Sequence, residues 1–236
     1  MNTLKKNARE AGLLYLLMAI PGGFGIMYVP STIIVAGDPD LTAANVLSNE
    51  MLFRIGIVSQ LVCNVVFIYL VLSLKRLLRT VNEHYASQMV ALVVVSVPIA
   101  FLNMGNQLAV LVMLKENWAG DAFNAIQLHT IMMLFLRIYE NGVMIVQIFW
   151  GLWLIPFGLL VYRSGFIPAF LGVLLVIGGF GYVIASLTGL LWPSHANVMG
   201  LAALPSAVAE FSIIFWLLIK GVRVGNNTGD LSTTLS

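Results

Sequence analysis

The sequence predicts an all-α protein that crosses a membrane six times. Of its 236 residues, 60% are hydrophobic and only 9% are charged, whereas a soluble domain has about 25% charged residues. Such a chain has too few polar side chains to cover a globular surface, which excludes a soluble enzyme. Six stretches are long enough to form the helix of roughly 20 apolar residues that crosses a bilayer; they lie at 12–29, 51–74, 88–114, 139–162, 166–190 and 199–219.

The first stretch begins like a signal peptide, because Lys5, Lys6 and Arg9 precede its apolar residues. The apolar core of a signal peptide is only about 7–15 residues long, and here the run continues to residue 29 with no convincing cleavage site behind it. We therefore expect an uncleaved first span. Pro21 should kink this helix, because proline removes a backbone donor and clashes with the preceding turn.

The connections between the spans differ in character. Residues 36–50, between the first two spans, are polar and rich in Asp, Asn and Pro. Residues 123–136, before the fourth span, are apolar enough to form an amphipathic helix at the membrane interface. Residues 225–236 have no apolar period and predict a disordered cytoplasmic tail. We expect residues 1–224 to form one transmembrane domain.

The positions of the basic residues predict the orientation. With six spans, both termini lie on one side, and that side carries nine of the twelve Lys and Arg residues. Basic residues mark the cytoplasmic side of a membrane protein, so we predict that both termini are cytoplasmic. The nine residues are Lys5, Lys6, Arg9, Lys75, Arg76, Arg79, Arg163, Lys220 and Arg223.

Four blocks of sequence carry a family resemblance. They read LFRIGIVS at 52–59, PIAFLN at 98–103, QIFWGLWLIP at 147–156 and YRSGFIP at 162–168. Together they resemble the bacterial integral membrane family catalogued as domain of unknown function 4386, over nearly the whole chain. The resemblance implies a multi-pass protein of a prokaryotic cytoplasmic membrane with about six helices. It implies no activity and no catalytic residues.

Glu210 is the ionisable residue at greatest predicted depth. It lies eleven residues into the sixth stretch, near the middle of the bilayer. An ionisable side chain at that depth is costly, and it usually faces the bundle interior and serves a function. We expect Glu210 to point toward Asn103 and Gln147 and to be neutral, since desolvation disfavours a carboxylate.

Amide side chains at similar depth predict a polar interior around this acid. Residues three or four apart share a helix face, which places Asn103 beside both Asn106 and Gln107 and groups Gln60 with Asn64. Gln147 lies on the same stripe as Glu140. If these faces converge, the interior is polar and open toward the outer side. Amides in spans also commonly hold helices together, each bond contributing about 0.6 kcal/mol, so packing alone is an open alternative.

Three charged residues should form an outer rim to this interior. Arg54 and Glu140 lie at the outer ends of the second and fourth spans. We expect Arg54 to pair with Glu140 or another outer acid, because an unpaired guanidinium in a bilayer is costly. Arg137 lies three residues from Glu140 and competes for it.

No motif predicts a cofactor, a metal site or nucleic acid binding. The sequence contains no P-loop, dinucleotide fingerprint or paired-histidine zinc motif. The single cysteine, Cys63, excludes an internal disulfide and a cysteine-based metal site. His129, Glu140 and His195 would form a metal site only if the fold brought them together, and we predict none.

We favour a protein that binds or moves a small molecule, an ion or a lipid head group through its polar interior, because intramembrane acids and Pro- or Gly-interrupted spans are typical of transporters. One alternative is an intramembrane enzyme with Glu210 as acid or base, which lacks an evident nucleophile. The other is a scaffold or subunit whose polar residues only pack. The sequence predicts the lipid bilayer as a partner and says nothing of the oligomeric state.

Overall fold

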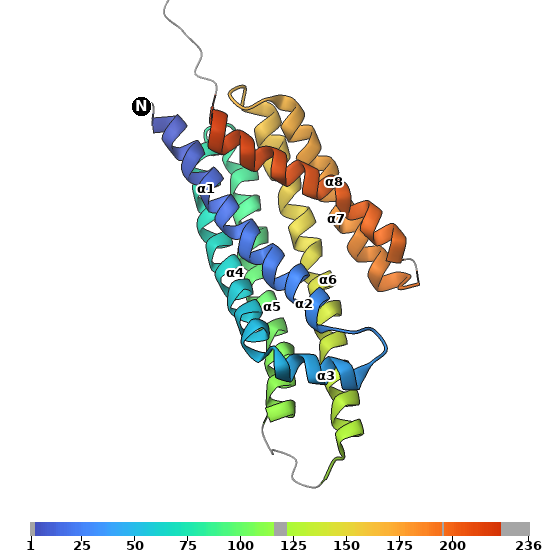
Figure 1. Ribbon diagram of the computed structural model, residues 1–236. Helices are drawn as coiled ribbons and strands as arrows, with labels where there is room; N and C mark the ends of the chain where they lie inside the picture. Colours follow the sequence, from blue (N-terminus) through green and yellow to red (C-terminus); the bar gives the residue numbers. More distant parts are fainter. Residues whose placement is uncertain (1–2, 116–121, 195, 223–236) are drawn as a thin grey trace, which may run out of the picture.

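The computed structural model describes residues 3–115, 122–194 and 196–222. These residues are all-α, and six of the helical segments are long and apolar enough to cross a membrane, which confirms the predicted spans. Figure 1 shows them as one elongated bundle. The elements are α1 (Thr3–Gly23), continued by the π-helical turn η1 (Phe24–Tyr28) and α2 (Val29–Ile33), then α3 (Pro39–Ser48), α4 (Glu50–Leu78), α5 (Glu83–Lys115), α6 (Ala125–Arg163), α7 (Ala169–Leu191) and α8 (Ala196–Phe215), continued by the π-helical turn η2 (Trp216–Lys220).

We call the end of the bundle where α1 begins the basic end, and the end that carries α3 the opposite end (Figure 1). The basic end holds the short α4–α5 and α6–α7 connections. Arg54, Lys115 and Arg137 lie toward the opposite end. Most of the basic residues are therefore gathered at one end of the folded bundle. The predicted tail at 225–236 lies outside the described residues.

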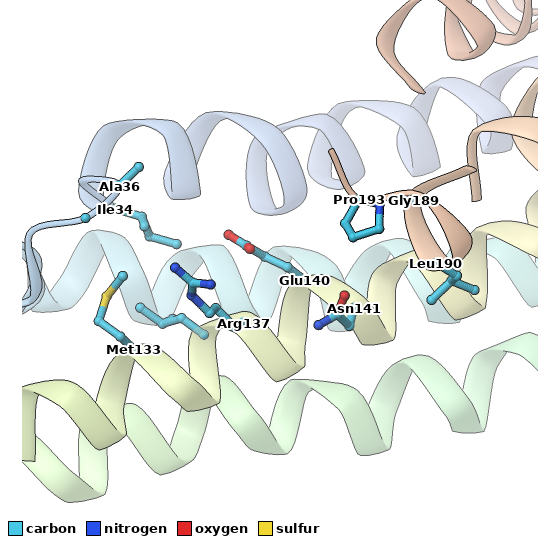
Figure 2. A pocket seen from close by; sticks show the side chains of 11 residues that line it. Ile34, Ala36, Met133, Arg137, Glu140, Asn141, Gly189, Leu190 and Pro193 are labelled. Atoms are coloured by element: carbon cyan, nitrogen blue, oxygen red, sulfur yellow. The ribbon is translucent and has the colours of Figure 1, made fainter. Parts of the chain in front are cut away.

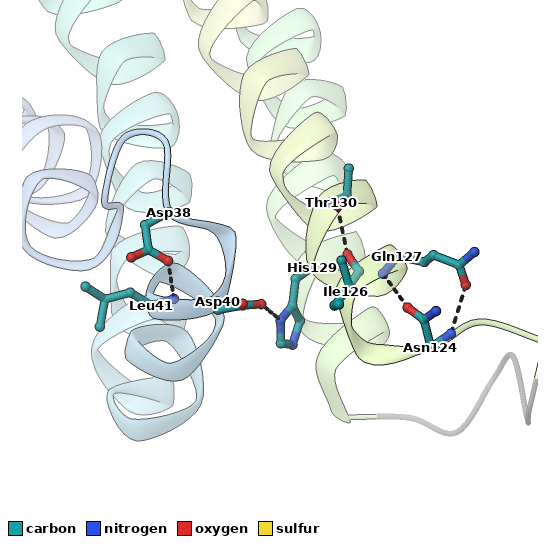
Figure 3. Close-up of polar contacts among 8 residues, drawn as sticks. All are labelled: Asp38, Asp40, Leu41, Asn124, Ile126, Gln127, His129 and Thr130. Atoms are coloured by element: carbon teal, nitrogen blue, oxygen red, sulfur yellow. Dashed lines mark hydrogen bonds and ion pairs between the residues drawn. The ribbon is translucent and has the colours of Figure 1, made fainter.

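The prediction of a separate interfacial helix at 123–136 is wrong. These residues form the start of α6, whose 39 residues span about 58 Å at 1.5 Å per residue. Asn124 and Gln127 form a capping box at its beginning (Figure 3). No glycine or proline follows until Gly142, so nothing separates an interfacial helix from the span. Figure 1 shows α5 and α6 extending beyond α3 at the opposite end.

The connection predicted as a polar loop contains a helix of its own, α3. Asp38 caps it by accepting a hydrogen bond from the Leu41 N–H at 2.9 Å, and Pro39 occupies its first turn. Both are ordinary helix-start signals. Asp40 contacts His129 on α6, with 2.6 Å between Oδ1 and Nδ1 (Figure 3). This contact fastens α3 across the opposite end of the bundle.

The helices α6 and α7 pack with their backbones in close contact. A Cβ built on Gly158 would lie 2.6 Å from the Gly172 carbonyl oxygen, and one built on Gly151 would lie 2.5 Å from that of Gly179. Only glycine permits such an approach, which is how membrane helices gain close packing.

The outward surface of the bundle is apolar, as lipid requires. Leu102 is 81% exposed, Met27 is 73% exposed and Leu201 is 68% exposed. Inside, Tyr15, Leu74 and other large side chains are fully buried between the helices. This inverted surface supports placement of the chain in a bilayer.

The first helix, α1, and the last span, α8 with η2, are closest near the basic end, where α1 contacts η2. A Cβ on Gly12 would lie 2.9 Å from the backbone nitrogen of Leu218. From there Figure 1 shows the two helices separating toward the opposite end of the bundle.

Candidate functional site

Glu210 lies near the middle of the span Leu201–Lys220 and joins three helices. Its Oε2 accepts a hydrogen bond of 2.7 Å from the Tyr15 hydroxyl on α1. Its Oε1 accepts one of 2.8 Å from the Tyr182 hydroxyl on α7. Each oxygen of the carboxyl group therefore has a tyrosine donor from a different helix.

The two tyrosines are held in place by their surroundings. Tyr15 is fully buried, and its ring packs against Trp153 and Phe157 at centroid distances of 5.9 and 6.5 Å. Its hydroxyl would be a costly unpaired group in this apolar interior without an acceptor. Glu210 supplies that acceptor.

A cavity of about 250 Å³ lies beside Glu210. Five helices contribute to its wall, and most of the wall is apolar or aromatic. At one side it is bordered by Gly23 and Met27 of the α1–η1 segment and by Ala207 and Phe211 of α8. These four residues are exposed, so the cavity opens sideways between the separating helices.

Asn64 adds a second polar group to the cavity wall. Its side chain is 3% exposed, and its amide nitrogen donates to the Gln60 backbone oxygen at 2.9 Å. The amide oxygen makes no hydrogen bond within the residues that the structure describes. It therefore remains available to whatever occupies the cavity.

The other predicted amides form a separate network around Gln60, which is 2% exposed. The Gln60 Nε2 donates to the Gly25 carbonyl and to the Gln107 Oε1, both at 3.1 Å. Its Oε1 accepts a hydrogen bond of 2.6 Å from the Tyr139 hydroxyl. One side chain thus links η1, α4, α5 and α6.

The backbone explains why a glutamine is needed there. In the π-helical turn η1, the Val29 N–H bonds to the Phe24 carbonyl, five residues back. In this pattern the Gly25 carbonyl would be bonded by the N–H of residue 30, which is a proline and has none. Gln60 supplies the missing donor. We expected the first span to become irregular at Pro21. Instead α1 continues as an α-helix through Pro21 to Gly23, and the irregular part is the π-helical turn η1 that follows.

Three further amides were predicted for this interior. Asn103 donates to the Tyr139 carbonyl at 2.9 Å, and Asn106 donates to the Asn103 carbonyl at 3.0 Å. Gln147 is half-buried and makes no side-chain hydrogen bond among the described residues. Glu210 bonds to Tyr15 and Tyr182, so the expected orientation toward Asn103 and Gln147 is wrong.

A second pocket, of about 410 Å³, lies toward the opposite end (Figure 2). Arg137, Glu140 and Asn141 of α6 contribute its polar lining, and Figure 2 shows the Arg137 and Glu140 side chains on the same side of the helix. Neither forms an ion pair within the described part of the chain. Arg137 and Glu140 therefore share this pocket, whereas Arg54, the third residue of the predicted rim, does not line it.

Arg54 lies elsewhere, in a cluster of charges at the opposite end. Its Nε is 2.8 Å from Glu50 Oε1, and Lys115 Nζ is 2.6 Å from Glu50 Oε2. Arg54 thus pairs with Glu50, four residues away on its own helix, and not with Glu140. The pairs connect the start of α4 to the end of α5.

No group of three or more metal-ligating side chains occurs in the described ranges. His129 bonds to Asp40, and His195 lies outside those ranges. Tyr15 and Tyr182 are the site residues that the sequence reasoning missed. The available signal was a tyrosine hydroxyl inside an apolar span, because a buried hydroxyl needs a partner.

Comparison with known proteins identifies the family. A stretch of 77 residues is 39% identical to an uncharacterized protein of Archaeoglobus fulgidus, and the match spans 33% of this chain and 44% of that protein. No solved structure matches the chain significantly. Residues 11–221, which include both pockets and the Gln60 network, match the family described as "Domain of unknown function (DUF4386)". The chain therefore belongs to the DUF4386 family.

Proposed function

We propose that this protein binds a small amphipathic molecule that enters the Glu210 cavity sideways from the bilayer. The observation that supports this most strongly is the composition of the cavity wall. Aromatic and aliphatic side chains form most of it, and Glu210, Tyr182 and Asn64 provide a few polar groups. Small-molecule sites in proteins have this composition, with an apolar wall and a few placed polar groups.

The position of the opening supports a membrane-soluble ligand. Met27 and Phe211, which are 73% and 54% exposed, border the cavity on the lipid-facing surface between α1 and α8. A molecule dissolved in the bilayer can reach Glu210 by this path without crossing an aqueous phase.

The Gln60 network supports a structural role for the amides. Gln60 bonds to Gln107 and Tyr139 on two other helices, and Asn103 on α5 bonds to the Tyr139 carbonyl on α6. Groups whose bonds are already made hold the helices together and offer little to a ligand. We therefore place the ligand at Glu210 and not among these amides.

Quenching of tryptophan fluorescence tests the proposal. Trp150 and Trp153 line the cavity, so the reporter chain has Trp118, Trp192 and Trp216 replaced by Phe and is reconstituted in phosphatidylcholine nanodiscs. The probe is 1-bromo-4-neopentylbenzene, whose bromine quenches a neighbouring indole. We expect saturable quenching as the probe concentration in the bilayer rises.

Two matched variants show whether the quenching arises in the cavity. Gly23 lines the cavity, and a Cβ added to it meets nothing within 4 Å, so we expect the bundle to accept Gly23→Leu and the leucine to obstruct the opening. Gly105 on α5 is equally unobstructed and lies outside the cavity. We expect Gly23→Leu to abolish saturable quenching and Gly105→Leu to retain it. Equal quenching in both variants, or no quenching of the reporter chain by this probe and by charged probes of the same shape, would contradict the proposal.

We further propose that the protein resides in the cytoplasmic membrane of a prokaryote with its basic end in the cytoplasm. The concentration of Lys and Arg at that end supports this orientation. In a Cys63→Ala background, Asp38→Cys and Thr80→Cys place single thiols at opposite ends of the bundle, both at exposed positions. We expect a membrane-impermeant maleimide to label position 38 in intact cells and to label position 80 only after lysis. The reverse pattern would overturn the orientation.

A further inference from the structure

We propose that the ligand of the lateral cavity is an organic cation and that the Glu210 carboxylate is its counter-ion. This inference rests on the proposed function and names the chemical class of the ligand. It rests on the charge of Glu210, on the aromatic residues of the cavity wall, and on the balance of hydrogen-bond donors and acceptors around the cavity.

Glu210 has no positive partner within the described residues. Its two oxygens contact only the hydroxyls of Tyr15 and Tyr182, and none of the ion pairs that those residues form includes it. A buried charge is costly unless a charge of opposite sign or a metal accompanies it, so Glu210 without a cation is expected to be the neutral acid predicted from the sequence, and a bound cation favours its carboxylate form. A cation in the cavity would supply the missing partner, since Glu210 itself is part of the cavity wall.

The tyrosine bonds leave the carboxylate able to receive such a ligand. An ionised carboxyl group has two oxygens with about four lone-pair sites and can only accept hydrogen bonds. Tyr15 and Tyr182 occupy one site on each oxygen. They fix the carboxylate in position while the remaining lone pairs stay free. The group is thus held in place before the ligand arrives.

The aromatic lining suits a cation as well. Trp150, Trp153, Phe67 and Phe211 all contribute to the cavity wall. The face of an aromatic ring attracts a cation within about 6 Å of its centroid, and tryptophan does so most strongly. Trp153 is held by a stacked contact with Phe157 at 5.3 Å and an edge contact with Phe67 at 5.1 Å, so its position is defined before binding.

The polar groups of the wall select against an anion. Among the described residues, no Lys, Arg or His lines the cavity. The hydroxyl protons of Tyr15 and Tyr182 are donated to Glu210, and one of the two Asn64 amide protons is donated to the Gln60 backbone. The other Asn64 amide proton and the indole N–H groups of Trp150 and Trp153 are the neutral donors that remain on lining residues. An anion would therefore lie beside the Glu210 carboxyl group with only neutral donors to bind it, whereas a cation finds a carboxylate and an amide oxygen.

Three probes of one shape but different charge test the inference. The cation is (4-bromobenzyl)trimethylammonium, the neutral probe is its carbon isostere 1-bromo-4-neopentylbenzene, and the anion is (4-bromophenyl)methanesulfonate. Each is titrated into the tryptophan reporter chain in phosphatidylcholine nanodiscs, and its Kd is referred to its concentration in the bilayer. We expect the cation to bind about ten-fold or more tightly than the neutral probe and the anion to bind least.

A variant then assigns the preference to Glu210. In Glu210→Gln, which retains the length of the side chain, we expect the cation to lose its advantage over the neutral probe. Because the order of the three probes is measured first in the unaltered site, the test does not depend on the folding of this variant. Equal or tighter binding of the neutral probe would overturn the inference and leave the proposed function standing. Failure of every probe to bind would overturn both, and a cation preference that survives in Glu210→Gln would overturn the role of Glu210.

Discussion

Replacing Gln60 by methionine tests the account of the amide network. Methionine is unbranched and similar in length, so Gln60→Met preserves the packing and removes the hydrogen bonds. The variant loses three bonds, to the Gly25 carbonyl, Gln107 and Tyr139. At about 0.6 kcal/mol for an interhelical bond in a membrane protein, the free energy of unfolding should fall by about 2 kcal/mol. Asn106→Met should cost less, because Asn106 bonds only to Asn103 on its own helix.

Replacing Pro30 should lower the cost of Gln60→Met, because it provides a second donor for one of the groups that Gln60 satisfies. In Pro30→Ala, residue 30 regains an N–H that can bond to the Gly25 carbonyl, which Gln60 otherwise satisfies. Gln60→Met should therefore cost about 0.6 kcal/mol less in the Pro30→Ala background than in the unaltered chain.

The assay is reversible unfolding in mixed detergent micelles, with the free energy of unfolding measured for the four chains of this double-mutant cycle. Two results would refute the reasoning. One is a cost of Gln60→Met below about 0.5 kcal/mol, less than a single interhelical bond contributes. The other is a cost that is unchanged or larger in the Pro30→Ala background.

Three further substitutions test other contacts, each by thermal unfolding in detergent. Gly158→Ala should destabilise the bundle by about 1–3 kcal/mol, because the added Cβ would lie 2.6 Å from the Gly172 carbonyl oxygen. Gly105→Ala, whose Cβ meets nothing within 4 Å, should leave the stability unchanged. Equal effects of the two substitutions would contradict the close packing of α6 and α7. Glu50→Gln removes the pairs with Arg54 and Lys115 and should cause a small loss that disappears in high salt; a loss independent of salt would be inconsistent with exposed ion pairs. Tyr182→Phe removes one of the two bonds to Glu210 and should cost about 1 kcal/mol; an unchanged unfolding temperature would show that this bond contributes nothing.

The spans were predictable because their signal is length and hydropathy, which need no knowledge of tertiary contacts. Five of the six predicted stretches lie wholly within helical segments of the structure, and the fifth, 166–190, begins three residues before α7. The errors occur at the helix ends outside the bilayer, where α6 begins at Ala125 and α3 forms between Pro39 and Ser48. There the hydropathy signal is weak and the capping residues decide. Asn124 and Asp38 were present in the sequence as caps and were not used in the prediction.

The candidate site was predictable only within single helices. The pairing of Asn103 with Asn106 follows from a spacing of three residues, and the structure has it. The partners of Gln107 and Glu210 lie on other helices, and a sequence of spans does not specify how each helix is rotated about its axis. Tyrosines also occur as interfacial anchors, so a tyrosine in a span does not by itself indicate a polar contact at depth.

Native mass spectrometry of the protein released from nanodiscs tests the central claim most directly, because it detects whatever occupies the cavity without a chosen probe. Gly23→Leu and Gly105→Leu are the comparison, since both glycines have open space around the added Cβ and only Gly23 lines the cavity. We predict a bound small molecule on the unaltered chain and on Gly105→Leu, and its loss from Gly23→Leu. A bound species that persists in Gly23→Leu, or no bound species on any chain, would contradict a ligand site beside Glu210.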